Sequence, residues 1–156
     1  MAAKIQLGNS VLCDYVAKGE GNKAILVNTY SGDVIAQTLP AMLGFGVFVE
    51  TFTPALAKLT GEVTVSLDGQ KLLSFQTEIA PNNGTEPAII AITQFQALVQ
   101  KDCDLEVSLR IPGFRVATVL KKRIRQQAVA MNPSPILPGL PGGRSLSVPP
   151  KKATSP

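Results

Sequence analysis

The sequence predicts an all-β protein: an antiparallel β-sandwich of about seven to nine strands, immunoglobulin-like or C2-like, followed by a flexible, proline-rich basic C-terminal tail. Two observations carry this prediction. Short β-prone runs recur about every 8–12 residues over most of the chain, with turn residues between them. Within these runs apolar and polar residues alternate, as they do when one face of a strand is buried and the other is solvated.

The first two runs predict a β-hairpin. They are Ser10–Ala17 and Lys23–Tyr30, and a glycine-rich link, KGEGN, joins them. After the turn SGD comes a shorter run, Val34–Leu39. Pro40 then fixes φ and lacks an N–H donor, so we expect it at the start or the edge of a strand.

Glycines mark the next run, Met42–Phe52, in which aromatic residues and valines alternate with Gly44 and Gly46. Glycine inside a strand pattern predicts a β-bulge or a close approach of another backbone. Pro54–Leu59 follows, and it is the only segment whose sequence resembles a helical turn.

The clearest hairpin spans Gly61–Ile79. Its first half alternates valine and leucine with polar residues, and Asp68-Gly69 is a standard sequence for a two-residue type I′ turn. Three more β-prone runs complete the pattern: Ala88–Leu98, Cys103–Ile111 and Arg115–Arg125.

The composition changes after the last strand, which divides the chain into a sandwich domain, residues 1–128, and a tail, residues 129–156. Residues 131–156 hold seven of the twelve prolines and no aromatic residue. Such a segment buries too little apolar area to offset the entropy lost on ordering. We expect it to be disordered, partly polyproline II, or ordered only by a partner.

Charge is distributed unevenly along the chain. Residues 1–120 carry eleven acidic and eight basic side chains, whereas residues 121–156 carry seven basic side chains and no acidic one. The formal net charge of +4 therefore arises in the C-terminal part. Such asymmetry suggests contact with something anionic.

Several classes of site are excluded by composition. Histidine is absent, which rules out Ser-His-Asp and Cys-His triads and any histidine-dependent zinc site. The sequence also lacks a paired-carboxylate motif, a glycine-rich phosphate loop and a nucleophile elbow. We therefore predict a protein that is not an enzyme and that needs no cofactor and no metal.

The sequence holds no apolar run of about 18 residues, the length that predicts a transmembrane helix, and no secretory signal. We expect a cytoplasmic protein without a membrane partner, in which Cys13 and Cys103 are buried, reduced thiols. A Cys13–Cys103 disulfide is the alternative.

One part of the chain resembles a known family. The resemblance lies in short stretches that are similar to the opening of small, uncharacterised bacterial proteins with a domain of unknown function: Val11-Leu12-Cys13-Asp14, Asn22-Lys23, Val27-Asn28-Thr29-Tyr30, Leu39-Pro40 and Leu43–Val49. It is good mainly over residues 11–49 and loose as far as residue 120. It implies a β-sandwich and carries over no catalytic residue. Asn28, where a glycine is common, and the long basic tail depart from the family's pattern.

Cys13-Asp14-Tyr15 has two interpretations. A reactive cysteine needs a nearby base or cation that lowers its pKa, and the next cation along the chain is Lys18. In a strand, Cys13 and Tyr15 share one face and Asp14 lies on the other. We favour a structural role, with Cys13 and Tyr15 in the core and Asp14 bonded to a neighbouring backbone group or lysine.

Asp102, Asp104 and Glu106 lie at a spacing of two and therefore share one face of a strand. Three carboxylates could bind a hard cation such as Ca²⁺, but an extended strand spreads successive ones by about 7 Å. We favour a solvated acidic face that pairs with lysine or arginine on the neighbouring strand.

The C-terminal part of the chain holds two sets of candidate binding residues. The first set is basic: Lys121, Lys122, Arg123, Arg125, Arg144, Lys151 and Lys152. The second is a set of apolar tail anchors: Ile136, Leu137, Leu140 and Leu146. No aromatic residue interleaves with the first four basic residues, so base stacking is not predicted. Pro135–Pro138 forms a P-x-x-P pattern, which suits an aromatic groove.

These features favour a non-enzymatic module for protein–protein interaction or assembly, such as a structural component of a larger complex, with the tail as an interaction arm. Self-association through the β-rich edges is the expected mode if the partner is a second copy. The alternative function is sequence-independent binding of nucleic acid or another polyanion through the basic C-terminal segment.

Overall fold

The computed structural model describes residues 4–20, 23–52, 58–80 and 85–128. Within these ranges the chain forms nine strands and no helix. The strands are β1 (Leu7–Lys18), β2 (Ala24–Thr29), β3 (Val34–Ala36), β4 (Ala41–Thr51), β5 (Leu59–Leu67), β6 (Gln70–Ile79), β7 (Ala88–Val99), β8 (Cys103–Arg110) and β9 (Ala117–Gln126). The all-β prediction is therefore confirmed.

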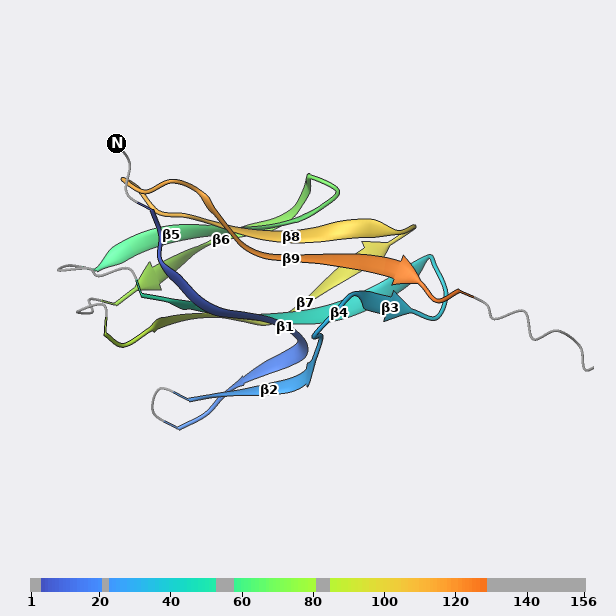
Figure 1. Ribbon diagram of the computed structural model, residues 1–156, viewed down its shortest axis with the longest axis horizontal. Coiled ribbons are helices and arrows are strands. Elements are labelled where there is room, and N and C mark those ends of the chain that lie inside the picture. The colour runs from blue at the N-terminus through green and yellow to red at the C-terminus, as the bar shows by residue number, and fades with distance from the viewer. Residues whose placement is uncertain (1–3, 21–22, 53–57, 81–84, 129–156) are drawn as a thin grey trace, which may run out of the picture.

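Two sheets face each other and form a sandwich (Figure 1). One has four strands in the order β2-β1-β4-β7, and the other has five in the order β3-β9-β8-β5-β6. Neighbouring strands in the described part of the chain are antiparallel, apart from β3 and β9, which run parallel. The prediction of a purely antiparallel sandwich is thus wrong for this one pair of strands. A parallel pair needs a long crossover, and here the crossover is the whole chain from β4 to β8.

The core lies between the sheets and follows from strand alternation. On β8, Cys103, Leu105, Val107 and Leu109 are buried, and the residues between them are only partly so. Phe45 on β4 is fully buried and has two ring contacts, with Tyr30 at 6.1 Å and Phe95 at 5.8 Å between centroids. Dispersion and burial of these side chains hold the two sheets together.

Local predictions about turns are confirmed where the structure describes them. Asp68 and Gly69 connect β5 to β6 with positive φ at both positions, 47° and 78°, as a type I′ turn requires. Pro40 directly precedes β4. The predicted helical turn falls mostly on residues 53–57, outside the described residues, and Leu59 at its end begins β5 instead. The predicted tail, residues 129–156, also lies outside them.

β1 belongs to two different pairings, and this shapes the surface of the molecule. Its first half, up to Cys13, pairs with β4, and its second half, from Cys13 to Lys18, pairs with β2. The β1–β2 hairpin thus leaves the sandwich and stands below it in Figure 1.

Gly46 of β4 lies opposite Cys13, the point at which β1 separates from β4. The pairing of β4 with β7 is irregular between Phe45 and Val47, which confirms the predicted bulge. A Cβ atom on Gly46 would lie 3.0 Å from the Val16 nitrogen and 2.9 Å from the Thr93 carbonyl oxygen. The predicted close backbone approach is therefore confirmed as well, and it allows the hairpin to pack onto the outer face of the four-stranded sheet.

Candidate functional site

The inward face of the β1–β2 hairpin packs on the outer face of the sandwich. Cys13, Val16 and Phe48 are buried together there and form a second apolar cluster, separate from the core between the sheets. Partly buried apolar side chains complete it: Val11, Ala24, Leu26 and Ile89. The hairpin is therefore fixed to the sheet by burial of apolar surface, which stabilises its orientation.

The outward face of the same hairpin is apolar and exposed. Tyr15 is 41%, Val27 41% and Ile25 58% accessible to solvent. Tyr15 lies opposite Val27 in the strand register, and Ile25 lies beside them on the same face. We call these three residues the hairpin face.

This exposure corrects one prediction. Tyr15 does not lie in the core, whereas Cys13 is fully buried as predicted. The two residues would share one face of the sheet if β1 stayed paired with β4. Because β1 leaves β4 after Cys13 and pairs with β2, the face that carries Tyr15 turns to solvent.

Asp14 on β1 joins the two strands of the hairpin at their open end. Its carboxylate accepts hydrogen bonds from Asn28 Nδ2 at 2.9 Å and from the Tyr30 hydroxyl. Asn28 has a φ of 52°, in the left-handed region that asparagine tolerates better than most residues. The structural role predicted for Asp14 is confirmed, with side-chain partners in place of a backbone group or lysine.

Neither cysteine is placed for reaction. Cys13 Sγ lies 3.5 Å from the Gly46 carbonyl oxygen, and burial raises the pKa of its thiol. Burial also raises the pKa of Cys103. Both are free thiols in separate clusters, so the Cys13–Cys103 disulfide is wrong.

The bond between Tyr30 and Asp14 makes a prediction about pH. Burial, the hydrogen bond to Asp14 and its negative charge raise the pKa of Tyr30 from 10.0 to about 12. In a Tyr15→Phe variant, which leaves Tyr30 as the sole tyrosine, we expect ultraviolet absorbance to report ionisation near pH 12. Since the folded-state pKa is the higher one, Tyr30 contributes stability fully below pH 10, and this contribution is lost as the pH rises towards 12.

The Asp14→Asn change in the same background removes the charge and should move the midpoint of Tyr30 downward. Circular dichroism at each pH distinguishes ionisation in the folded state from unfolding. A midpoint near 10 in the folded Tyr15→Phe variant would contradict the assignment.

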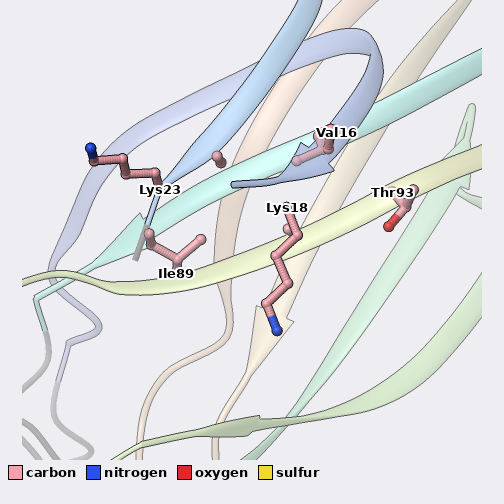
Figure 2. Close-up of a pocket in the computed structure, with 8 residues that line it drawn as sticks. Val16, Lys18, Lys23, Ile89 and Thr93 are labelled. Atoms are coloured by element: carbon pink, nitrogen blue, oxygen red, sulfur yellow. The ribbon is translucent and has the colours of Figure 1, made fainter. Parts of the chain in front are cut away.

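A groove of about 410 Å³ lies between the end of the hairpin and β7. Eight residues from β1, β2, β7 and the link between the first two line it: Val16, Ala17, Lys18, Lys23, Ala24, Ile89, Ala91 and Thr93. Figure 2 shows Lys18 and Lys23 on different sides of Ile89. Neither lysine forms a salt bridge with any residue that the structure describes.

The acidic row on β8 is engaged by its neighbours. Asp104 pairs with Lys121 at 3.3 Å and Arg123 at 3.5 Å, and Glu106 accepts a hydrogen bond from Thr118. Asp102 accepts a hydrogen bond from the Gln126 backbone N–H at 2.9 Å. The described residues hold no acidic, cysteine or histidine cluster suited to a metal ion. The predicted pairing of this acidic face with lysine and arginine on the neighbouring strand is thus confirmed for Asp104.

The basic residues of β9 also have partners within the chain. Besides the two that pair with Asp104, Arg125 pairs with Asp33 at 3.2 Å and Lys122 donates to the Ser31 carbonyl oxygen at 2.9 Å. All four predicted binding residues on β9 are therefore neutralised or bonded locally. The remaining predicted binding residues lie outside the described residues: Arg144, Lys151, Lys152, Ile136, Leu137, Leu140 and Leu146.

Sequence reasoning missed the hairpin face and the groove. Both assemble only because β1 changes partner from β4 to β2 after Cys13, and no local sequence pattern predicts this change. One signal was present: Ala24–Thr29 is an uncharged β-prone stretch, and edge strands usually carry a protective charge or proline.

Comparison with known proteins adds no relative: no protein-family model and no curated protein matches the chain. The resemblance to the uncharacterised bacterial family therefore stays a prediction. Among the described residues, no helix is long and apolar enough to span a membrane.

Proposed function

We propose that this protein is a non-enzymatic interaction and assembly module, and that the hairpin face is its contact surface. The observation that carries the proposal is the exposure of Tyr15, Ile25 and Val27 on the outward face of the β1–β2 hairpin. Aromatic and branched apolar side chains that cluster on a surface are typical of contact sites between proteins.

The edge beside this face also supports the proposal. In the described part of the chain, β2 is an end strand of its sheet, so one side of its backbone is free to pair. Asp14 and the inward apolar cluster hold the hairpin in one orientation, which lowers the ordering entropy lost on binding. Residues 129–156 are proposed as a second contact element, an arm beyond β9.

Polyanion binding has less support. Asp104 and Asp33 engage three of the four basic residues on β9, and a phosphate would have to compete with these carboxylates. A cytoplasmic setting is part of the proposal, since two free buried thiols suit a reducing compartment.

Substitution of the hairpin face tests the proposed function. We expect the double change Ile25→Asp and Val27→Asp to weaken self-association or partner capture by the full-length protein about tenfold or more, because it places two charges in an apolar contact. Analytical ultracentrifugation and cross-linking followed by mass spectrometry measure the two readouts.

Leu72→Asp is the matched control, because Leu72 is an exposed apolar residue, 39% accessible, on β6. It should leave association unchanged. If the hairpin variant retains every contact of the parent protein while its circular dichroism spectrum is unchanged, the hairpin face is not the contact surface.

A further inference from the structure

We propose that the groove beneath the hairpin, together with the free edge of β7, binds an extended acidic segment of a partner protein by strand addition. This site is distinct from the hairpin face and does not depend on it. A failure of the hairpin-face variants would leave this proposal standing, and the reverse also holds.

The first argument is the edge of β7. This strand has twelve residues, and it is an end strand of the four-stranded sheet among the described strands. β4 pairs with it along almost its whole length on one side. Its other side can hydrogen-bond to an added strand, as in other cases of peptide recognition at a sheet edge.

The second argument is that the groove is lined by the same strand, β7. Ile89, Ala91 and Thr93 are alternate residues of β7 that line the groove. A strand added beside β7 lies about 4.8 Å away and presents its own alternate side chains on that face. Those side chains would reach the apolar wall formed by Val16 and Ala24 of the hairpin.

The third argument is charge. Lys18 and Lys23 line the groove, no carboxylate does, and neither lysine has a salt bridge within the described residues. In Figure 2 the Lys18 side chain extends past β7 on the side away from β4, where an added strand would lie. Acidic side chains on that strand would pair with the lysines, while lysine or arginine there would be repelled.

Charge also decides against an occupant from the same chain. The C-terminal segment, residues 121–156, has no acidic residue and seven basic ones. It would bring like charge to Lys18 and Lys23. The chemistry of the groove therefore points to an acidic segment of another protein.

A synthetic peptide tests the proposal on the full-length protein. The probe is a fluorescein-labelled strand of about nine residues, with aspartate, valine and aspartate at successive groove-facing positions and threonine elsewhere. We expect fluorescence anisotropy to show binding that weakens with salt. The Lys18→Met and Lys23→Met double variant should bind at least about threefold more weakly, whereas Lys71→Met, at an exposed lysine on β6, should bind as the parent does.

Two further peptides separate strand addition from simple charge attraction. N-methylation of the amides that face β7 should weaken binding about tenfold or more, because it removes main-chain hydrogen bonds. A peptide with lysine in place of aspartate should not bind. The proposal is overturned if the acidic peptide does not bind, if the Lys18 and Lys23 double variant binds it equally well, or if either altered peptide binds as tightly.

Discussion

Replacing Gly46 with alanine is expected to lower the free energy of unfolding by about 1–3 kcal/mol. The new Cβ atom would meet the Thr93 carbonyl oxygen at 2.9 Å, the Val16 nitrogen at 3.0 Å and the Tyr15 carbonyl carbon at 3.1 Å. All three are backbone atoms, so no side chain can rotate away. The entropy that alanine removes from the unfolded chain would stabilise by only about 0.4–1 kcal/mol, so the clash should prevail.

Urea denaturation measures this effect, and Gly32→Ala is the control, since a Cβ at Gly32 meets nothing within 4 Å. The Gly46 variant should also free the hairpin before the sandwich unfolds, which amide exchange in β2 would report. Equal stability of the two variants would mean that the backbones of β1 and β7 do not approach Gly46 as closely as described.

Replacing Phe45 with alanine is expected to cost about 3–5 kcal/mol of stability, a large share of what a domain of this size has. Phe45 is fully buried, and its ring contacts Tyr30 and Phe95 at the centre of the sandwich. Its removal leaves a cavity that rigid strands on both sides cannot close.

Urea denaturation with an unchanged m-value would show that stability alone changed. Leu72→Ala is the control, because Leu72 is 39% exposed and its truncation should cost well under 1 kcal/mol by comparison. A loss of less than about 1 kcal/mol for Phe45→Ala would place the centre of the core elsewhere.

The sequence predicts the strands well wherever a strand stays in one sheet. On β8 the buried residues fall at every second position from Cys103 to Leu109, as the alternation requires. The β5–β6 hairpin is equally local, because Asp68-Gly69 by itself favours the turn that sets the register. Period and turn chemistry suffice for these elements.

What sequence could not predict depends on contacts between distant residues. The exposure of Tyr15 depends on where β1 changes partner, from β4 to β2. The groove depends on the end of β1 and the start of β7, which lie far apart in the sequence, lining the same cavity. The sequence identifies the basic residues of β9 but not the acidic residues that pair with them. Asp33 lies beside Arg125 because β3 pairs in parallel with β9, a contact between distant parts of the chain.

The position of β9 has a consequence for how the chain folds during synthesis. β9 lies between β3 and β8 in the five-stranded sheet, although β3 is made early and β9 is the last strand described. Until Ile124 and its neighbours leave the ribosome, β3 has no strand beside it and one hydrogen-bonding edge of β8 has no partner. Folding is therefore expected to complete only after translation of β9, at the slower rates typical of proteins with distant strand pairings.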